Sequence, residues 1–325
     1  MGTVLHTSPL FEPEGAGADL LRDAGHTIVT RRYHPGRTEP ELVALMEEVQ
    51  PVGVIAGLDP FTEEVIAAGA WHGLRVIART GVGYDTIDLA AATAHGVVVT
   101  TTVGSNTDAV ADLTFALLLA LARRIPYHDR LVRQGQGWTR VYGPELSGKT
   151  LGIVGLGMIG RAVARRAAGF GMRLVANDLA PDTGYAAAQG ITYLALDDLL
   201  GQSDVVTLHV TLNPTSQGLI GARELGLMKP AALLLNTSRG GVVDEAALCR
   251  ALAMSSIAGA GLDVFEREPP LGSPLLALEN VVLTPHCAGT SRESVPRAAL
   301  MAARSVAAVL AGQQPPSSVN PQVTG

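Results

Sequence analysis

Three side chains in the last third of the sequence could together carry out an acid–base reaction. Arg239 in "NTSRGG", Glu268 in "GLDVFEREPP" and His286 in "LTPHCAG" each follow a short apolar run that predicts a strand. An imidazole can exchange a proton near neutral pH, a carboxylate can orient it and stabilise its protonated form, and a guanidinium can grip a carboxylate in a fork. Hydride transfer to or from a 2-hydroxy acid requires this set beside a nicotinamide cofactor.

Each of these residues also has a simpler interpretation. Arg239 could cap a helix or form a surface ion pair, Glu268 could be a solvated loop acid, and His286 could be a core histidine. A dinucleotide site in the same part of the chain would favour the catalytic interpretation of the three residues taken together.

Residues 151–178 predict such a dinucleotide site. "LGIVGLGMIGRAVARRAAGFGMRLVAND" reads as strand, glycine turn, helix and second strand, and it ends in an acid. Gly155 suits the tight turn, Gly157 the close approach of a pyrophosphate, and Gly160 the packing of helix on strand. Asp178 lies where a carboxylate accepts hydrogen bonds from ribose hydroxyls. Because that carboxylate would repel a 2′-phosphate, we predict NAD and not NADP as the cofactor.

A second glycine pattern, "GPELSGKT" at residues 143–150, matches the phosphate loop of ATP-binding proteins. Such a loop works only between a strand and a helix. No apolar run precedes Gly143, and a predicted strand follows Thr150. The order of elements therefore argues against ATP and for an ordinary loop.

Strand and helix candidates alternate in two blocks, which predicts an α/β protein with two Rossmann-like domains and parallel sheets. The second block holds six predicted strands, "LGIVG", "RLVAND", "VVTLHV", "ALLLNT", "AGAGLDV" and "VVLTP". The last helix candidate, residues 294–312, has no further sheet of its own to join. It should therefore pack on the first domain, which makes that domain discontinuous. The predicted boundaries are 1–101 with 288–325 for a substrate-binding domain and 102–287 for an NAD-binding domain.

A helix and an arm at residues 107–147 should connect the two blocks. The helix "TDAVADLTFALLLALARR" is apolar on nearly every side, so we expect it to be buried all round, between domains or in an oligomer interface. The glycine- and arginine-rich stretch 124–147 should be irregular.

Charge and composition argue against several other classes of protein. A net charge of −6 disfavours a nucleic-acid partner, and no apolar run is long enough to span a membrane. Cys249 and Cys287 are too few for a disulfide framework, which indicates a reducing cytoplasm, and Cys287 should be a small buried hydrophobe. The histidines show no metal-binding spacing, so we predict no metal.

"GLGMIG", "NTSRGGVVDEAAL", "GLDVFEREPP" and "TPHCAG", with "RTGVGYDTIDLAAATAHGVVV" before them, resemble the D-isomer-specific 2-hydroxyacid dehydrogenases over nearly the whole chain. The resemblance implies interconversion of a D-2-hydroxy acid and its 2-oxo acid, with Arg239, Glu268 and His286 as the catalytic residues. It implies a homodimer built largely on residues 107–147, and an Asp263 near the nicotinamide amide. The implied substrate-binding residues are Gly81, Val82, Gly83 and Arg239. The implied NAD contacts are Gly155, Gly157, Met158, Ile159, Gly160, Asp178, Val210, Thr237, Ser238, Asp263 and Gly289.

Within that family the pattern is most similar to the 3-phosphoglycerate dehydrogenases, through "RTGVGYDTIDLAAA" and "GGVVDEAAL". Two positions depart from it. "AGLDPFT" replaces an R-S-x-T type of loop, and Thr211 stands where a proline is usual. The first departure weakens the expectation of a phosphate-bearing substrate and leaves hydroxypyruvate, glyoxylate, a branched 2-oxo acid or a phosphonate analogue open. From another class, an NAD-sensing binding protein like the corepressors that share this fold is the alternative.

Overall fold

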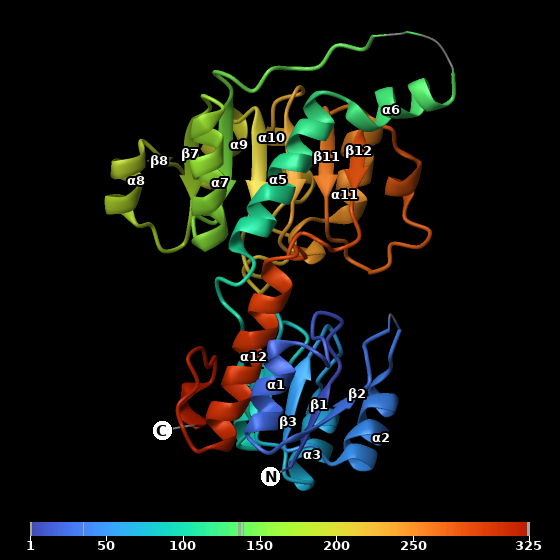
Figure 1. The fold of residues 1–325 in the computed structure, drawn as a ribbon. Coiled ribbons are helices and arrows are strands. Elements are labelled where there is room, and N and C mark those ends of the chain that lie inside the picture. Colours follow the sequence, from blue (N-terminus) through green and yellow to red (C-terminus); the bar gives the residue numbers. More distant parts are fainter. Residues whose placement is uncertain (1, 35, 136–137, 139, 324–325) are drawn as a thin grey trace. The chain divides into compact units, whose positions relative to one another are not determined.

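The computed structural model describes residues 2–34, 36–135, 138 and 140–323, and the chain divides into two compact units. Unit 1 is Met1–Asn106 with Gly289–Gly325, and unit 2 is Thr107–Ala288. Each unit is built around one parallel sheet (Figure 1). The predicted fold class, two parallel α/β domains of which the first is discontinuous, is confirmed. The first boundary between the units lies five residues later in the chain than predicted, and the second lies one residue later. The roles of the two units stay predictions.

The sheet of unit 1 has five parallel strands in the order β2-β1-β3-β4-β5. The two central strands are fully buried, and apolar except for Arg79, because helices cover both faces of a parallel sheet. The sequence analysis did not identify the strand at Thr3–His6 or the helices at Ala16–Asp23 and Leu89–Ala94. The strands are β1 (Thr3–His6), β2 (Thr27–Thr30), β3 (Gly53–Ala56), β4 (Val76–Arg79) and β5 (Val98–Thr100).

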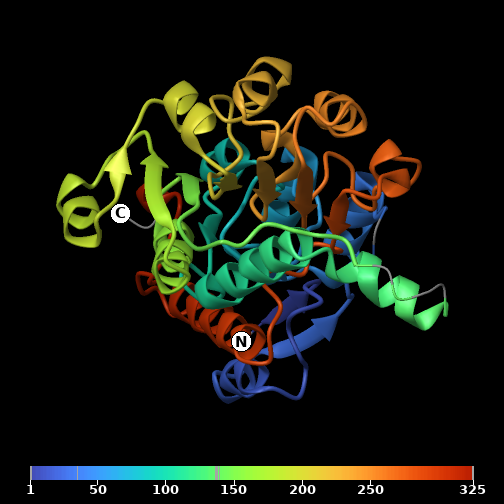
Figure 2. The same ribbon diagram turned by 90° about the horizontal axis from the view of Figure 1, so that it is seen from above.

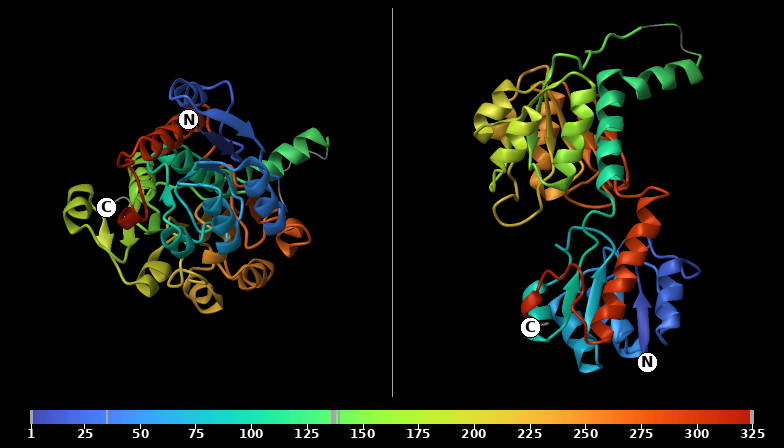
Figure 3. Two further views of the ribbon diagram at one scale, coloured as in Figure 1. Left: turned by 90° about the horizontal axis from the view of Figure 1, so that it is seen from below. Right: turned by 60° about the vertical axis from the view of Figure 1, so that its left-hand side comes forward.

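Two helix layers cover this sheet. One core cluster joins the sheet to α2 (Glu39–Val49), α3 (Glu63–Trp71) and α4 (Leu89–Ala94), and another joins it to α1 (Ala16–Asp23) and α12 (Ser294–Leu310). Helices α1 and α12 lie side by side (Figure 3). Contact is close enough that a Cβ on Gly17 would lie 2.9 Å from the backbone oxygen of Ala299. The last predicted helix therefore packs on the first domain.

The sheet of unit 2 has seven parallel strands in the order β12-β11-β10-β9-β6-β7-β8. The prediction of six strands was wrong by one, since β8 has only two residues and is too short to show a periodic pattern. The strands are β6 (Thr150–Val154), β7 (Arg173–Asn177), β8 (Thr192–Tyr193), β9 (Val205–Leu208), β10 (Leu233–Asn236), β11 (Gly259–Leu262) and β12 (Val281–Leu283).

Helices also cover both faces of the second sheet (Figure 2). Helices α5 (Thr107–Ala122) and α7 (Met158–Gly169) pack on one face, and α9 (Leu196–Gln202), α10 (Ala222–Leu227) and α11 (Glu245–Ala253) on the other. Helix α8 (Thr183–Gln189) lies beside β8. Helix α5 is not covered all round within the single chain: Asp112 and Ala116 are exposed, and Leu113 and Leu119 are half-buried.

The arm after α5 is not irregular throughout, so that prediction was wrong in its first part. Helix α6 (Ile125–Arg133) begins after Arg124, which has a left-handed backbone, and Pro126 suits its first turn. Residues 136, 137 and 139 of the arm lie outside the described residues. The "GPELSGKT" segment leads directly into β6 at Thr150, so it lacks the helix that an ATP phosphate loop requires.

Three short 3₁₀ helices complete the described elements: η1 (Gly240–Val242), η2 (Pro274–Ala277) and η3 (Pro321–Val323). Among the described helices, none is both long and apolar enough to cross a membrane.

Candidate active site

The glycine turn between β6 and α7 has room for a ligand at one of its three glycines. Gly155 has a φ of +92°, and a Cβ there would lie 2.6 Å from the backbone oxygen of His209. A Cβ on Gly160 would overlap the backbone oxygen of Gly155. At Gly157 no atom lies within 4 Å of the Cβ position. Two glycines are therefore required by the packing of the chain itself, and the third faces open space.

The N-terminus of α7 suits an anion. Gly157 is the N-cap residue, no side chain caps the helix, and its first turn has no acidic residue. The first N–H groups therefore point outward without a side-chain partner, as anion binding at a helix N-terminus requires. Met158 is 54% exposed beside this turn, and Ile159 packs against the core. The turn fits a dinucleotide pyrophosphate.

Asp178 follows β7 directly and lies against the glycine turn. One carboxylate oxygen accepts a hydrogen bond from the N–H of Leu156 at 2.7 Å, and the other from the N–H of Ala180 at 2.9 Å. This is the place where a ribose-binding acid stands in dinucleotide sites. On the other side of the turn, Val210 Cγ1 lies 3.0 Å from the Cβ position of Gly155. The predicted residues of this half of the site are thus brought together.

Thr237 and Ser238 lie on a turn that Asn236 holds. The Asn236 oxygen accepts hydrogen bonds from the N–H of Ser238 at 3.0 Å and from its hydroxyl at 2.8 Å. Its amide nitrogen donates to the carbonyl of Arg239 at 2.9 Å. Thr237 shares a hydrogen bond with Thr114 of α5 at 3.0 Å. The sequence analysis missed Asn236, although an Asn at a strand end before Thr-Ser is a known turn signal.

His286 and Glu268 form a direct pair. The Nδ1 atom of His286 lies 2.7 Å from Oε2 of Glu268, and the two side chains are 26% and 31% exposed. The other oxygen of Glu268 accepts a hydrogen bond from the N–H of Phe265 at 3.1 Å. Because Nδ1 faces a carboxylate, the neutral ring is assigned the tautomer with its proton on Nδ1 and its lone pair on Nε2. Nε2 is then the atom that can exchange a proton with a substrate.

Asp263 holds the loop that carries His286. Its carboxylate is fully buried and accepts hydrogen bonds from the Thr284 hydroxyl at 2.6 Å, the Cys287 N–H at 2.9 Å and the Ala288 N–H at 2.8 Å. His286 has a φ of 50°, a left-handed conformation that is uncommon for a residue with a Cβ. The three hydrogen bonds fix this conformation on both sides of His286. The contact of Asp263 with the nicotinamide amide stays a prediction.

Arg239 lies at the same edge of the sheet as the His–Glu pair. It follows β10, Glu268 follows β11 and His286 follows β12, and these strands are neighbours in the sheet. A Cβ on Gly240 would overlap the backbone of Phe265, so the chain at Arg239 packs directly on the loop that leads to Glu268. A guanidinium nitrogen of Arg239 donates to the carbonyl of Ser238 at 2.9 Å. The structure thus gathers all three predicted catalytic residues in unit 2.

The predicted substrate-binding residues Gly81, Val82 and Gly83 belong to unit 1 and follow β4. A Cβ on Gly81 would lie 2.9 Å from a guanidinium nitrogen of Arg79, so glycine suits this close approach. Gly289 also belongs to unit 1, where a Cβ would lie 2.8 Å from the side-chain nitrogen of Asn106.

The "AGLDPFT" segment of unit 1 carries a buried ion pair. Asp59 is fully buried and accepts a hydrogen bond from Arg37 at 2.8 Å, and the Arg37 side chain is 8% exposed. Burial raises the pKa of the Asp59 carboxyl, while Arg37 and Thr7 oppose that shift. The loop therefore contains the buried, charge-balanced Arg37–Asp59 pair, which the sequence analysis did not predict.

Cys287 stays a thiol in this site. Burial, followed by the neighbouring Asp263 carboxylate, raises its pKa. A protonated thiol is a poor nucleophile, so the chemistry of the loop belongs to His286.

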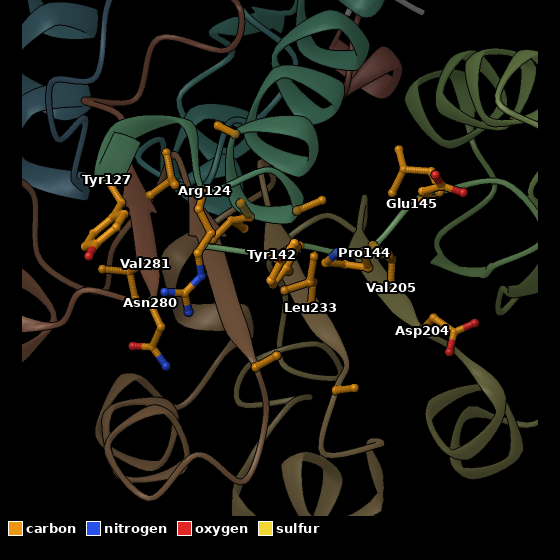
Figure 4. Close-up of a pocket in the computed structure, with 18 of the residues that line it drawn as sticks. Arg124, Tyr127, Tyr142, Pro144, Glu145, Asp204, Val205, Leu233, Asn280 and Val281 are labelled. Carbon is orange, nitrogen blue, oxygen red and sulfur yellow. The ribbon is translucent and has the colours of Figure 1, made fainter. Parts of the chain in front are cut away.

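A pocket of about 310 Å³ lies at the opposite, amino-terminal edge of the same sheet (Figure 4). It is enclosed by the beginnings of β9 to β12, the end of α5 and the arm, with Arg124, Tyr127, Tyr142 and Leu233 in its lining. None of the predicted site residues lines it. This pocket is therefore separate from the candidate active site.

Residues 115–288 match the family model described as "D-isomer specific 2-hydroxyacid dehydrogenase, NAD binding domain". A curated protein named glyoxylate reductase, from Korarchaeum cryptofilum (strain OPF8), is 46% identical over 293 residues, which are 87% of this chain and 87% of that protein. A D-3-phosphoglycerate dehydrogenase from Mycobacterium bovis (strain ATCC BAA-935 / AF2122/97) is 41% identical over 291 residues, which are 89% of this chain and 54% of that protein.

A solved structure covers almost the whole chain as well. It is an NADPH-dependent glyoxylate/hydroxypyruvate reductase from Sinorhizobium meliloti in complex with NADP and malonate. It is 30% identical in sequence, with a TM-score of 0.83, and the match covers 98% of this chain and 96% of that chain. The similarity therefore extends over both units.

Proposed function

Because the chain belongs to the D-isomer specific 2-hydroxyacid dehydrogenases, we propose that it reduces small 2-oxo acids of the glyoxylate and hydroxypyruvate type with NADH. The protein is an NAD-dependent oxidoreductase that acts on CH–OH groups. The predictions of its enzyme class and of NAD as its cofactor are confirmed by the family model.

Sequence identity supports this choice of substrate. The relative named glyoxylate reductase is 46% identical to this chain, whereas the one named D-3-phosphoglycerate dehydrogenase is 41% identical. The Arg37–Asp59 pair adds a physical argument, because a charge-balanced pair at the "AGLDPFT" segment gives a substrate phosphate little attraction. The second candidate substrate is 3-phosphohydroxypyruvate, favoured by the 41% identity to the Mycobacterium protein.

His286 acts as the general acid of reduction in this proposal. Nε2 of the protonated ring gives its proton to the carbonyl oxygen of the substrate, and in the reverse direction it takes the hydroxyl proton. Glu268 keeps the ring oriented through Nδ1 and stabilises the imidazolium. The nicotinamide, when bound, supplies the hydride in reduction and accepts it in oxidation.

Arg239 and the turn after β4 bind the substrate in the same proposal. The Arg239 guanidinium would hold the substrate carboxylate and polarise the adjacent carbonyl, which favours the charge that develops on oxygen. Backbone N–H groups at Gly81, Val82 and Gly83 of unit 1 are proposed to help bind a substrate carboxylate.

Asp178 would set the preference for NADH over NADPH. Each of its oxygens accepts one backbone hydrogen bond and keeps further lone pairs for ribose hydroxyls. The related Sinorhizobium enzyme is NADPH-dependent, so preference within the family depends on such local residues.

A second copy of the chain would cover α5 and the arm. Besides the half-covered α5, three apolar side chains near it are strongly exposed, Ile125, Val132 and Tyr142 at 52%, 62% and 94%. Exposed apolar groups clustered on one segment are typical of protein interfaces. Light scattering should give twice the 33.7 kDa chain mass, and a monomer at micromolar concentration would refute the homodimer. A cytoplasmic location fits the two cysteines, both of them free thiols.

NADH oxidation against a panel of glyoxylate, hydroxypyruvate, phosphonopyruvate and 3-phosphohydroxypyruvate tests the proposed activity. We expect turnover of the first two to exceed that of the phosphate-bearing acid. His286→Ala should lower turnover about 10²- to 10⁴-fold and leave NADH binding intact, while His95→Ala, at an exposed position, should change neither. NADH binding without turnover of any acid would favour the sensor alternative.

A further inference from the structure

The glycine turn of unit 2 is held from two sides at one residue, Leu156. Its N–H donates to Asp178 at 2.7 Å, and its carbonyl accepts a hydrogen bond from Nε of Arg161 at 3.1 Å. Both partners belong to unit 2. Arg161, in the first part of α7, therefore lies beside the carboxylate proposed to bind the adenosine ribose.

Arg161 is itself held in place by two neighbours. A guanidinium nitrogen donates to Oδ2 of Asp182 at 2.8 Å, and the guanidinium carbon lies 4.1 Å from the ring centre of Tyr185. Stacking on the ring and pairing with the carboxylate both fix the direction of the guanidinium. The Arg161 and Asp182 side chains are 33% and 47% exposed, so a ligand can reach them.

Asp182 has two tasks in the connection between β7 and α8. Its Oδ1 caps α8 by accepting a hydrogen bond from the N–H of Tyr185 at 3.0 Å. Its Oδ2 balances the charge of Arg161. The cap hydrogen bond and then Arg161 hold the pKa of Asp182 below its usual range, so the carboxylate is ionised at neutral pH.

Arg161 is the cation of this region. Between Asp178 and Arg223 the sequence has no Lys or Arg. A 2′-phosphate on the ribose would approach Asp178 and the connection that follows it, where the Arg161 guanidinium could pair with it. The Asp182 carboxylate already forms an ion pair with the Arg161 guanidinium.

We propose that Asp182 is a second determinant of coenzyme choice: by pairing with Arg161 it withholds from the 2′-phosphate of NADP the guanidinium that lies beside the ribose-binding carboxylate. The proposal rests on the proposed role of Asp178. Asp178 repels the phosphate, and Asp182 removes the cation that would attract it. Loss of the Asp182 charge should turn Arg161 into a phosphate ligand.

Equilibrium binding of NADH, NADPH and adenosine 2′,5′-bisphosphate to four proteins tests this. The proteins are the wild type, Asp182→Asn, Arg161→Gln and the double variant. Asn keeps the helix cap and removes the charge. We expect Asp182→Asn to tighten the two phosphorylated ligands about fivefold, the upper size of an exposed charge-assisted contact, with NADH within twofold. In the Arg161→Gln background the same substitution should give no gain.

Asp182→Ser gives an independent check, since serine also caps the helix but is too short to reach Arg161, and it should show the same gain. Asp197→Asn is the matched control, because it breaks a similar exposed pair between Asp197 on α9 and Arg223 on α10, at the other face of the sheet. No tightening in both Asp182 variants, or equal tightening in the double variant, would overturn the proposal. Failure of the Asp178 role is distinguishable: Asp178→Asn would then leave the NADPH to NADH affinity ratio unchanged while the Asp182 effect persists.

Discussion

The first strand–turn–helix segments of the two units differ in what fills the turn. Both sheets reverse their strand order beside that turn, between β1 and β3 in unit 1 and between β6 and β9 in unit 2. Open α/β sheets bind ligands at such points. In unit 2 the space at the Cβ position of Gly157 is open, whereas in unit 1 the end of β1 at His6 and the turn residues Thr7 and Ser8 are all fully buried.

Side-chain hydrogen bonds close the turn of unit 1. The Ser8 hydroxyl bonds the Thr80 hydroxyl, and Thr7 accepts from the N–H of Gly57 at 3.3 Å. The His6 ring lies 5.0 Å from that of Phe11. The two units therefore share the reversal of strand order, but buried side chains fill the turn beside it in unit 1, which leaves the turn of unit 2 as the predicted dinucleotide site.

Breaking the buried Arg37–Asp59 pair of unit 1 should have the largest effect, on the free energy of unfolding. Asp59→Ala leaves Arg37 buried without its carboxylate, and loss of one partner of a buried pair lowers the free energy of unfolding by about 3 kcal/mol. Thermal or urea unfolding measures this, with NADH affinity unchanged because Asp59 is not part of unit 2. Asp19→Ala, in an exposed pair with Arg22, should change stability far less. Equal stability of the Asp59 and Asp19 variants would contradict the comparison.

A methyl group in the open glycine turn of unit 2 should have the second-largest effect, on the affinity for NADH. Gly157→Ala puts a methyl group where no atom of the chain lies within 4 Å, so folding is unaffected while the pyrophosphate loses its closest approach. We expect the Kd for NADH to rise about 50-fold with an unchanged Tm. Gly169→Ala, at the end of the same helix and equally free of contacts, is the control. Unchanged NADH affinity in Gly157→Ala would show that the open space is not the pyrophosphate site.

The ionisation of two histidines, the buried His6 and the half-buried His209, should have the smallest effect, on the pH dependence of stability. Burial lowers the pKa of His209 to about 3, and burial with the charge of Arg32 lowers that of His6. Between about 3 and 6.5 the unfolded chain binds a proton at position 209 that the folded chain does not. Stability due to His209 is therefore full above 6.5 and falls as pH decreases, by up to about 1.4 kcal/mol per pH unit.

Unfolding at pH 7, 6 and 5 checks this for His209→Gln, which keeps a side-chain nitrogen near the Thr207 hydroxyl now bonded to the ring at 2.9 Å. The variant should lose part of the acid sensitivity of the wild type. The same pH dependence in both proteins would exclude His209 as its source.

The dinucleotide half of the site could be predicted from sequence because its requirements are local. Gly155 and Gly160 are needed where the chain contacts itself, and Asp178 follows a strand whose neighbours fix its position. The placement of the three predicted catalytic residues at one edge of the sheet could be anticipated because each follows a predicted strand, and adjacent parallel strands bring their ends together.

What sequence could not predict depends on contacts between distant residues. Nothing in the pattern around Asp263 says that its carboxylate holds the backbone at Cys287 and Ala288, or that Asp182 pairs with Arg161. Helix α6 was missed because it has no buried residue, so no core-facing pattern of apolar residues marks it in the sequence.

The discontinuity of unit 1 has a consequence for how the protein is synthesised. Helix α12 covers β3 and β4 and lies against α1, yet the ribosome produces it after all of unit 2. Asn320, which bonds the backbone at Val97 and Val99, emerges later still. Unit 2 is one continuous stretch and can fold while it is being translated. During that time the face of the first sheet that α12 will cover stays exposed. The nascent chain should therefore be most prone to aggregation, and most dependent on chaperones, shortly before α12 and Asn320 leave the ribosome.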